Sequence, residues 1–491
     1  MKYSSYLEYR ISKTQYIQLS NACDEVIRRN LSSKAIVAQD FLHVSRYSPL
    51  MSQSYAGFYK NNILSFFVYT LCVVRSIIFF IKKIIHSFFY RDLNISNFDK
   101  KIDYLFVSHY TGKKNSQVYV DSYFGEIIEK IDTQKFKVAV VYINHTDHKS
   151  KKLYKNGQIN SFLLNDSIGF LSLVKIYKES LFSLLRFESV DKNIISKKLS
   201  IKAQFGLFSP GTVKTQIIAN HVKNLIATLS PKYLVTTYEG HSWERLCFAL
   251  AKEAKPLVKC IAYQHAPIFK YQHAIKRGIG ESYDPDIILA SGAVSEKKLL
   301  SYDKLNNSKV LLVGSGRFLP ESSKFDKKSP AIDTCLVAPE GTISECIILF
   351  SFALECAKKT KSINFIWIFP SQIDIVMLKK QSAVFKALEK NISISDSSLE
   401  DDIGNSNYIL YRGSSVVIQA VLLGLSPMCF MRDNELSMDP LFLYQENGRV
   451  IRDFEDFNKK INDKKIVSKE LKAHCRNIYT NIDIKILERI K

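Results

Sequence analysis

Short apolar runs alternate with amphipathic stretches from about residue 100 onward. The runs have the length and β-branched content of buried strands, and the stretches between them have helical spacing, as at 212–229 and 242–254. The expected strands are 104–108, 136–142, 233–236, 259–263, 287–290 and 310–313. Strands that alternate with helices predict a parallel sheet.

The alternation restarts after a linker rich in turn residues at 316–330. The second set of expected strands is 334–338, 364–369, 392–395, 408–411 and 427–430, with helices at 342–358 and 415–423. We therefore predict an α/β protein with two Rossmann-like domains, residues 100–320 and 321–465, and a cleft between them. Residues 466–491 form a basic helical stretch that we expect to pack back on the first domain.

Residues 1–99 are predicted to form a helical, membrane-associating region. Their segment 63–89 is strongly apolar but contains Arg75, Lys82 and Lys83. Arg75 falls near the middle of the only candidate span, which favours an interfacial helix on an anionic inner-membrane surface over a spanning helix. A helix buried in the core is the third possibility. The first residues lack the apolar stretch of a signal peptide, so we expect a cytoplasmic protein, peripheral on the inner membrane.

The formal net charge of +22 is high, although 46% hydrophobic and 24% charged residues are ordinary for a globular protein. Such a charge favours phosphate-bearing substrates and anionic lipid, unless it only coats the surface with solvated lysines. No nucleic-acid partner is expected, because zinc-finger spacing and RNA-binding aromatic motifs are missing. The 9 cysteines include no CxxC pair and are expected to be buried free thiols. Without an HExxH motif, and with Pro285 making a turn of the DxD-like pair Asp284 and Asp286, no metal or other cofactor is predicted.

In open α/β sheets, ligands bind beyond the carboxyl ends of the strands, where helix amino termini present N–H groups to anions. In the second half of the chain, Arg412, Gly413, Ser414 and Ser415 follow an expected strand and open a helix. The glycine allows close backbone approach and the two hydroxyls suit phosphate oxygens, although a serine N-cap alone also explains the pattern. We predict that this loop binds the phosphate of a donor.

A second donor-binding candidate is the first strand–loop–helix unit of the second domain, with Glu340, Gly341 and Thr342. Thr342 and Glu345 have the spacing of a capping box, which is a sufficient structural explanation for both. Because the loop opens onto the predicted cleft, it is included in the predicted donor site.

In the first domain, Glu239 ends a strand at the predicted cleft and is the candidate general base for an acceptor hydroxyl. A helix-capping role is its structural alternative. His241 and Glu244 follow it and are predicted acceptor contacts, although Glu244 is also suited to anchoring its own helix.

His265 ends the next strand and is a candidate acid, base or phosphate ligand. The turn after the first strand supplies His109 and Tyr110 as candidate acceptor contacts, and Asp121 as a further catalytic candidate. Either His109 or Asp121 competes with Glu239 for the role of base.

Together these motifs resemble bacterial GT-B glycosyltransferases of surface carbohydrates, especially those that use CMP-activated sialic-acid-like or Kdo sugars. The resemblance covers roughly residues 100 to 430 and rests on VSHYTG, YFGE, YEGHSWER, YQHAP, APEGTISE, FIWIFP and YRGSS. In that family an acidic-acidic-glycine motif supplies the general base. A His-Pro motif contacts the donor phosphate, and a serine pair at a helix amino terminus holds phosphate oxygens.

On this chain the resemblance implies that Glu239-Gly240 supplies the base and that Ser414-Ser415 holds phosphate. Two positions depart from the family pattern. Tyr238 stands in place of the first acid, and Phe369-Pro370 stands in place of His-Pro. The candidates for the missing donor contact are Ser371, Gln372 and His265, and the predicted donor site includes Pro370 and Ser371.

The implied activity is metal-independent transfer of a nonulosonic acid or Kdo from its CMP donor to a bacterial glycan, such as lipopolysaccharide O-antigen or capsule. Three alternatives remain open. They are a UDP- or GDP-hexose transferase of the same architecture, a polyol-phosphate transferase, and a catalytically silent glycan-binding scaffold.

Overall fold

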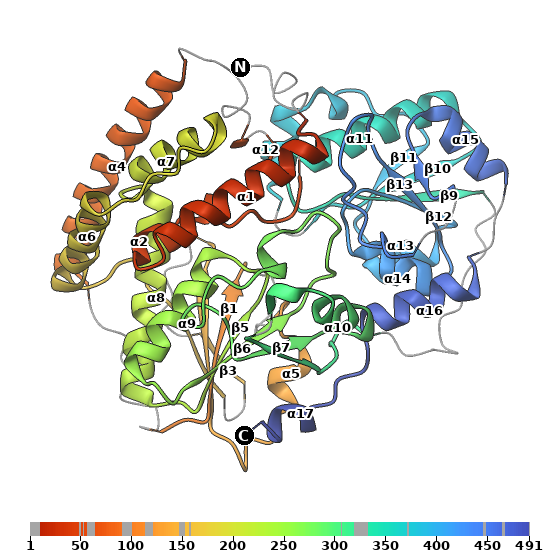
Figure 1. The fold of residues 1–491 in the computed structure, drawn as a ribbon. Helices are drawn as coiled ribbons and strands as arrows, with labels where there is room; N and C mark the ends of the chain where they lie inside the picture. Colours follow the sequence, from red (N-terminus) through yellow and green to blue (C-terminus); the bar gives the residue numbers. More distant parts are fainter. Residues whose placement is uncertain are drawn as a thin grey trace.

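Two parallel α/β sheets, each covered by helices, make up most of the protein in the computed structural model (Figure 1). The structure describes residues 10–48, 51–52, 54–55, 64–90, 101–112, 121–146, 153–156, 159–305, 307–318, 332–370, 373–444, 448–463 and 467–490. The prediction of two Rossmann-like domains is confirmed.

The sheet of the first domain has the strand order β3-β4-β2-β1-β5-β6-β7-β8. Its strands are β1 (Tyr104–Tyr110), β2 (Val138–Asn144), β3 (Leu153–Asn156), β4 (Ile159–Leu163), β5 (Tyr233–Thr237), β6 (Lys259–Gln264), β7 (Ile287–Ala290) and β8 (Lys309–Leu312). All neighbours are parallel except β3, which runs antiparallel to β4. The central strands are buried along almost their whole length, because helices cover both faces.

The second domain holds a sheet with the order β11-β10-β9-β12-β13-β14, parallel throughout. Its strands are β9 (Thr334–Ala338), β10 (Asn364–Trp367), β11 (Ile392–Ile394), β12 (Tyr408–Tyr411), β13 (Ser426–Phe430) and β14 (Val450–Ile451). β9 and β12 are neighbours, so the loops that follow them lie side by side at one edge of the sheet.

Helices cover both sheets and extend the first domain on one side. They are α1 (Lys13–Arg29), α2 (Lys34–Val37), α4 (Leu64–Phe88), α5 (Glu126–Glu129), α6 (Phe170–Leu185), α7 (Ile194–Gly206), α8 (Pro210–Leu229), α9 (Ser242–Ala254), α10 (Ala293–Leu300), α11 (Ile343–Lys359), α12 (Ile375–Gln381), α13 (Leu399–Gly404), α14 (Val416–Leu422), α15 (Phe454–Asn462), α16 (Lys469–Ile478) and α17 (Lys485–Glu488). Short 3₁₀ helices are η2 (Asp40–Leu42), η3 (Ala274–Lys276), η4 (Asp303–Leu305) and η5 (Ala383–Phe385). Figure 1 shows α4, α6 and α7 together on the side of the first domain away from the second sheet.

The amino-terminal segment 10–48 belongs to the core of the first domain. Leu19, Val26 and Ile36 are fully buried in the same apolar cluster as Leu105 of β1. Such continuous burial stabilises the segment on the sheet, at about 25 cal/mol for each square ångström of apolar surface removed from water.

The carboxyl-terminal helices lie against both domains. α16 packs on α14 of the second domain and on α10 of the first. Leu487 of α17 belongs to a core cluster of the first sheet, where the Tyr104 hydroxyl donates to its carbonyl oxygen at 2.8 Å.

The sequence favours an interfacial helix over a spanning one, and it predicts that the cysteines are buried free thiols. Among the described residues, no helix combines the length and apolar character needed to cross a bilayer. All nine cysteines are free, and each is buried except Cys72 on α4.

Candidate functional site

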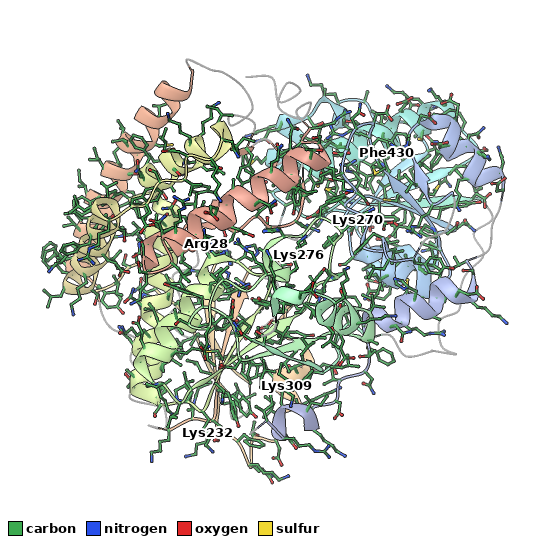
Figure 2. The ribbon with its side chains drawn as sticks, viewed as in Figure 1. Arg28, Lys232, Lys270, Lys276, Lys309 and Phe430 are labelled. Atoms are coloured by element: carbon green, nitrogen blue, oxygen red, sulfur yellow. The ribbon has the colours of Figure 1, made fainter. Side chains whose placement is uncertain are left out.

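The carboxyl ends of the first sheet's parallel strands face the second domain. Lys232 and Lys309, at the amino ends of β5 and β8, lie at the far end of the first domain in Figure 2. Lys270, which follows β6, lies beside the second domain in the same view. The predicted site residues of the first domain therefore lie at the junction between the two domains.

The loop after β5 is held in shape by a buried carboxylate. Glu244 accepts hydrogen bonds from the backbone N–H groups of Glu239, at 3.0 Å, Gly240, at 2.7 Å, and His241, at 2.8 Å. Gly240 has φ +83°, and a Cβ atom there would lie 2.4 Å from the carbonyl of Ala274. Glu244 therefore anchors its own loop, as the structural alternative proposed, and burial raises its pKa to about 7.

Two carboxylates flank one imidazole at this loop. His241 Nε2 lies 3.1 Å from Glu239 Oε2, and His241 Nδ1 lies 3.5 Å from Asp40 Oδ1. Burial alone lowers the pKa of His241, but hydrogen bonds to Asp40 and Glu239 raise it well above its usual value. Burial alone raises the pKa of Glu239, but His241, His265 and Arg46 hold it far below its usual value. The two opposite pKa shifts favour the ionised form of Glu239 and the protonated form of His241.

Further imidazoles line the same edge of the sheet. His109 Nδ1 lies 2.8 Å from His145 Nε2, and His109 Nε2 lies 3.2 Å from Thr237 Oγ1. Tyr123 packs against His109 and, edge-on, against His265, with ring centroids 4.8 and 5.1 Å apart. Burial lowers the pKa of His109 to about 3 and that of His265 to about 4. Both are neutral near pH 7, so neither supplies a positive charge for binding phosphate.

Three other residues of the first domain lie in interior positions. Tyr110 is in the apolar core, because it follows His109 on β1 and so points to the opposite face of the sheet. Tyr238 is fully buried in the core. The buried Asp121 Oδ1 accepts backbone hydrogen bonds from Tyr123, at 2.7 Å, and Phe124, at 2.9 Å, so this carboxylate shapes its own turn.

A contact from the amino-terminal segment joins the two domains. Arg46 forms an ion pair with Glu340 of the second domain and stacks over the ring of Phe269, 4.3 Å from its centroid. The backbone N–H of Tyr47 donates to the carbonyl of Tyr271 at 2.6 Å, which places Arg46 at the junction.

The sequence reasoning missed Asp40 and Arg46 because both lie in a region predicted to associate with the membrane. No local motif marks either residue, because their position depends on contacts with segments far along the chain, such as the backbone hydrogen bond from Tyr47 to Tyr271. We call Asp40, Arg46, His109, Glu239, His241, His265 and Glu340 the junction site.

The predicted capping box in the second domain is only half formed. Thr342 accepts a hydrogen bond from the backbone N–H of Glu345 at 3.3 Å, but the Glu345 side chain does not return one. Glu345 Oε2 instead accepts from Arg412 Nε at 2.6 Å, and Arg412 Nη2 lies 3.0 Å from Glu435 Oε1. All three of these charged side chains are buried, so Arg412 neutralises two interior carboxylates.

The loops after β9 and β12 touch each other. A Cβ atom on Gly413 would lie 2.5 Å from Glu340 Oε2, so this glycine permits the close approach. Gly341 is exposed, Ser414 is buried, and Ser415 is partly exposed. Ser415 precedes α14, a helix of 7 residues, and its side chain does not cap that helix.

Other predicted positions lie at the edges of this arrangement. Pro370 is partly exposed after β10, whereas Ser371 and Gln372 lie outside the described residues.

Among the residues that the structure describes, no group of three or more His, Cys, Asp or Glu is arranged to hold a metal ion. Asp284 pairs with Arg245, and Asp286 Oδ2 accepts from the backbone N–H of Cys260 at 2.6 Å, so the DxD-like pair stabilises the first domain.

A cavity of about 640 Å³ lies elsewhere in the first domain. Its lining includes Leu31, Lys34, Glu253 and Tyr283, and it contains none of the predicted site residues. The chemistry-bearing side chains gather at the junction and not around this cavity.

The chain matches no protein-family model, and no curated protein matches it in sequence. Similar solved structures include a putative UDP-N-acetylglucosamine 2-epimerase from Listeria monocytogenes, at 13% identity over 78% of this chain and 93% of that chain, with a TM-score of 0.45. An α,α-trehalose-phosphate synthase (UDP-forming) from Burkholderia vietnamiensis has 9% identity over 79% and 95% of the two chains, with a TM-score of 0.44. The glycosyltransferase SnogD from Streptomyces nogalater has 11% identity over 79% and 98%, with a TM-score of 0.40. These similarities concern the two-domain fold alone.

Proposed function

We propose that the protein transfers a sugar from a nucleotide-sugar donor to a hydroxyl of a glycan acceptor, with Glu239 as the general base. The observation that supports this role is the position of the Glu239 carboxylate at the domain junction, where its side chain is 32% exposed and lies 3.1 Å from His241. A base must be deprotonated and accessible before the acceptor arrives, and Glu239 meets both conditions.

In the proposed step, the acceptor hydroxyl donates a hydrogen bond to Glu239. Its oxygen bonds to the anomeric carbon of the donor sugar while the bond from that carbon to the phosphate oxygen breaks. The proton passes to Glu239, and the nucleotide leaves with the electron pair. The cations of His241 and Arg46 stabilise the negative charge that develops near the junction.

In the proposed reaction, Asp40 and Glu244 support the step without contacting the substrate. Asp40 orients His241 from the other side of the ring, at 3.5 Å. Glu244 fixes the backbone of the loop that carries Glu239. Both are positioning residues.

For the donor, the motif resemblance favours CMP-nonulosonate or CMP-Kdo, with UDP- and GDP-hexoses as the second class. The loops after β9 and β12 are the proposed donor contacts, because both border Glu340 and hence the junction site. The proposed acceptor is a lipid-linked surface glycan.

The experiment that tests the base is Glu239→Gln, which keeps the size of the side chain. We expect turnover, measured as nucleotide released from donors incubated with glycan acceptor, to fall about 100-fold or more while nucleotide affinity is retained. Wild-type turnover in Glu239→Gln, together with its loss in His109→Ala or Asp121→Asn, would assign the base elsewhere.

A further inference from the structure

The exposed face of α4 is apolar, whereas its inner face mixes polar and apolar side chains. Leu71, Val74, Ile78, Ile81 and Ile85 recur at helical spacing and are all exposed, Leu71 by 68% and Ile78 by 63%. The inward side carries the buried Lys83 and Ser87 beside the apolar Phe79 and Ile84.

Lys83 anchors α4 to the first domain. Its Nζ lies 3.0 Å from Asp166 Oδ2 and also contacts the Asp166 carbonyl. Phe79 and Ile84 pack with Ile176 of α6 in a small apolar cluster. The orientation of α4 is therefore set by specific contacts, and its apolar stripe has no cover among the described residues.

An exposed apolar stripe also occurs on α6, which lies beside α4. Leu171, Val174, Leu181 and Leu185 form one exposed stripe at helical spacing, with Leu171 exposed by 75%. Its inward side includes Ser180 and Ser183, whose hydroxyls bond to Leu207 O at 3.2 Å and to Ser33 Oγ at 2.6 Å.

α7 continues the apolar surface. Its exposed residues include Ile194, Ile201 and Phe205. Contacts of α4 with α6 and α7 hold the three helices together, and Figure 1 shows them on one side of the first domain. Soluble monomers rarely expose apolar patches of more than about 300–600 Å², so apolar stripes on three adjacent helices indicate a partner.

The charges on the three helices themselves are almost all positive, although the exposed Asp166, Glu188 and Asp191 lie on the segments beside them. Exposed basic side chains on or beside the three helices are Arg75, Lys82, Lys175, Lys178, Arg186 and Lys197. α4 and α7 contain no Asp or Glu, and α6 contains only Glu179. Apolar stripes bordered by Lys and Arg fit the headgroup region of an anionic bilayer, where the side chains enter the acyl boundary and the cations meet phosphate.

We propose that α4, α6 and α7 form a single three-helix surface that docks on an anionic lipid bilayer. This extends the predicted membrane contact of 63–89 to two further helices, α6 and α7. It is independent of the proposed transfer reaction. The surface lies on the side of the first domain away from the second (Figure 1), so docking leaves the junction site open to substrates.

The experiment measures sedimentation of the full-length protein with vesicles of phosphatidylethanolamine and phosphatidylglycerol, and with vesicles of phosphatidylcholine alone. We expect binding to the anionic vesicles, weakened by high salt. The double variant Leu171→Glu/Leu185→Glu on α6 and the single variant Ile78→Glu on α4 should each reduce partitioning about tenfold or more. Lys175→Gln/Lys178→Gln should reduce it about fivefold for each charge removed.

The matched control is Leu300→Glu, an exposed leucine on α10 away from the three helices, which should bind like the wild type. Circular dichroism melting shows that each variant is folded. Unchanged binding by the folded α6 variant would overturn the three-helix surface. A dimer without lipid, dissociated by Ile78→Glu, would show that a second copy of the chain covers these helices instead.

Discussion

The imidazole of His241 bridges Glu239, 3.1 Å from Nε2, and Asp40, 3.5 Å from Nδ1. The two carboxylates come from chain positions some 200 residues apart, one before β1 and one after β5. The charge of the junction site therefore depends on whether His241 is protonated.

The first prediction concerns that histidine. Asp40→Asn should lower the pKa of His241 toward the usual value of 6.5, because one of its two anionic partners is lost. Titration of labelled histidine side chains by NMR measures this shift. Asp433→Asn, at an exposed position, is the control and should leave the His241 pKa unchanged. An unchanged His241 in Asp40→Asn would contradict the bridge.

The bridge also gives stability a pH dependence. The folded-state pKa of His241 is raised, so its contribution is present below its usual pKa and is lost as pH rises through the higher folded value. The folded-state pKa of Glu239 is depressed, so its contribution is present above its usual pKa and is lost as pH falls through the lower folded value. The stability that His241→Gln removes should therefore be largest at about pH 5 to 7 and decline on the alkaline side. Denaturant unfolding of both proteins across this range measures it.

The second prediction concerns the backbone of the loop. Gly240→Ala should lower the free energy of unfolding by about 1–3 kcal/mol or more, because φ is +83° and the new Cβ meets the Ala274 carbonyl. Gly211→Ala is the matched control, since Gly211 near the start of α8 has no atom within 4 Å of the Cβ position. That variant should be neutral or stabilised by up to about 1 kcal/mol. Equal effects of the two substitutions, measured by denaturant unfolding, would contradict the tight packing of Gly240.

The third prediction separates a structural from a donor-binding role for Arg412. Arg412→Met should destabilise the protein by about 3–5 kcal/mol even without nucleotide, because the buried Glu345 would lose its ion-pair partner and the buried Glu435 would keep only Arg432. Arg452→Met removes a pair with Asp433 that is exposed on both sides, and should cost about 1 kcal/mol or less. Wild-type stability in Arg412→Met with loss of nucleotide affinity would instead make Arg412 a ligand contact.

The fourth prediction concerns the donor. CMP should raise the melting temperature more than UMP, UDP or GDP at equal concentration, since saturation a hundredfold above Kd stabilises a protein by about 2.7 kcal/mol. Ser414→Val/Ser415→Val should remove most of that shift, because both hydroxyls are lost. The measurement is run with and without a divalent cation.

A larger shift with UDP or GDP would reject the CMP class and leave the transfer reaction standing. The absence of any shift up to millimolar nucleotide would favour the scaffold alternative.

Much of the fold follows from local pattern. The apolar runs at 334–338 and 408–411 coincide with β9 and β12, because a strand buried on both faces must be apolar along its whole length. The helix expected at 242–254 coincides with α9, because a helix that packs on a sheet has an apolar stripe along one face. Such features depend on neighbours a few residues away.

The helices α6 and α7 were not predicted, although their sequences are amphipathic. Each carries leucine or isoleucine on its exposed side as well as on its buried side, so the sequence pattern alone does not show which apolar residues face the core. Packing against α4 and α8 fixes the outer face of α6, and packing against α1 and α4 fixes that of α7.

By itself, the sequence determined the two α/β domains and the strand ends at which Glu239 and His265 stand. Only the tertiary structure decided which side chains meet there. A backbone hydrogen bond from Tyr47 to Tyr271 brings Arg46 to the junction, whereas Tyr110 falls on the core face of β1. The physical reason is that secondary structure depends on residues close in sequence. A site depends on contacts between distant segments, which carry no local signature.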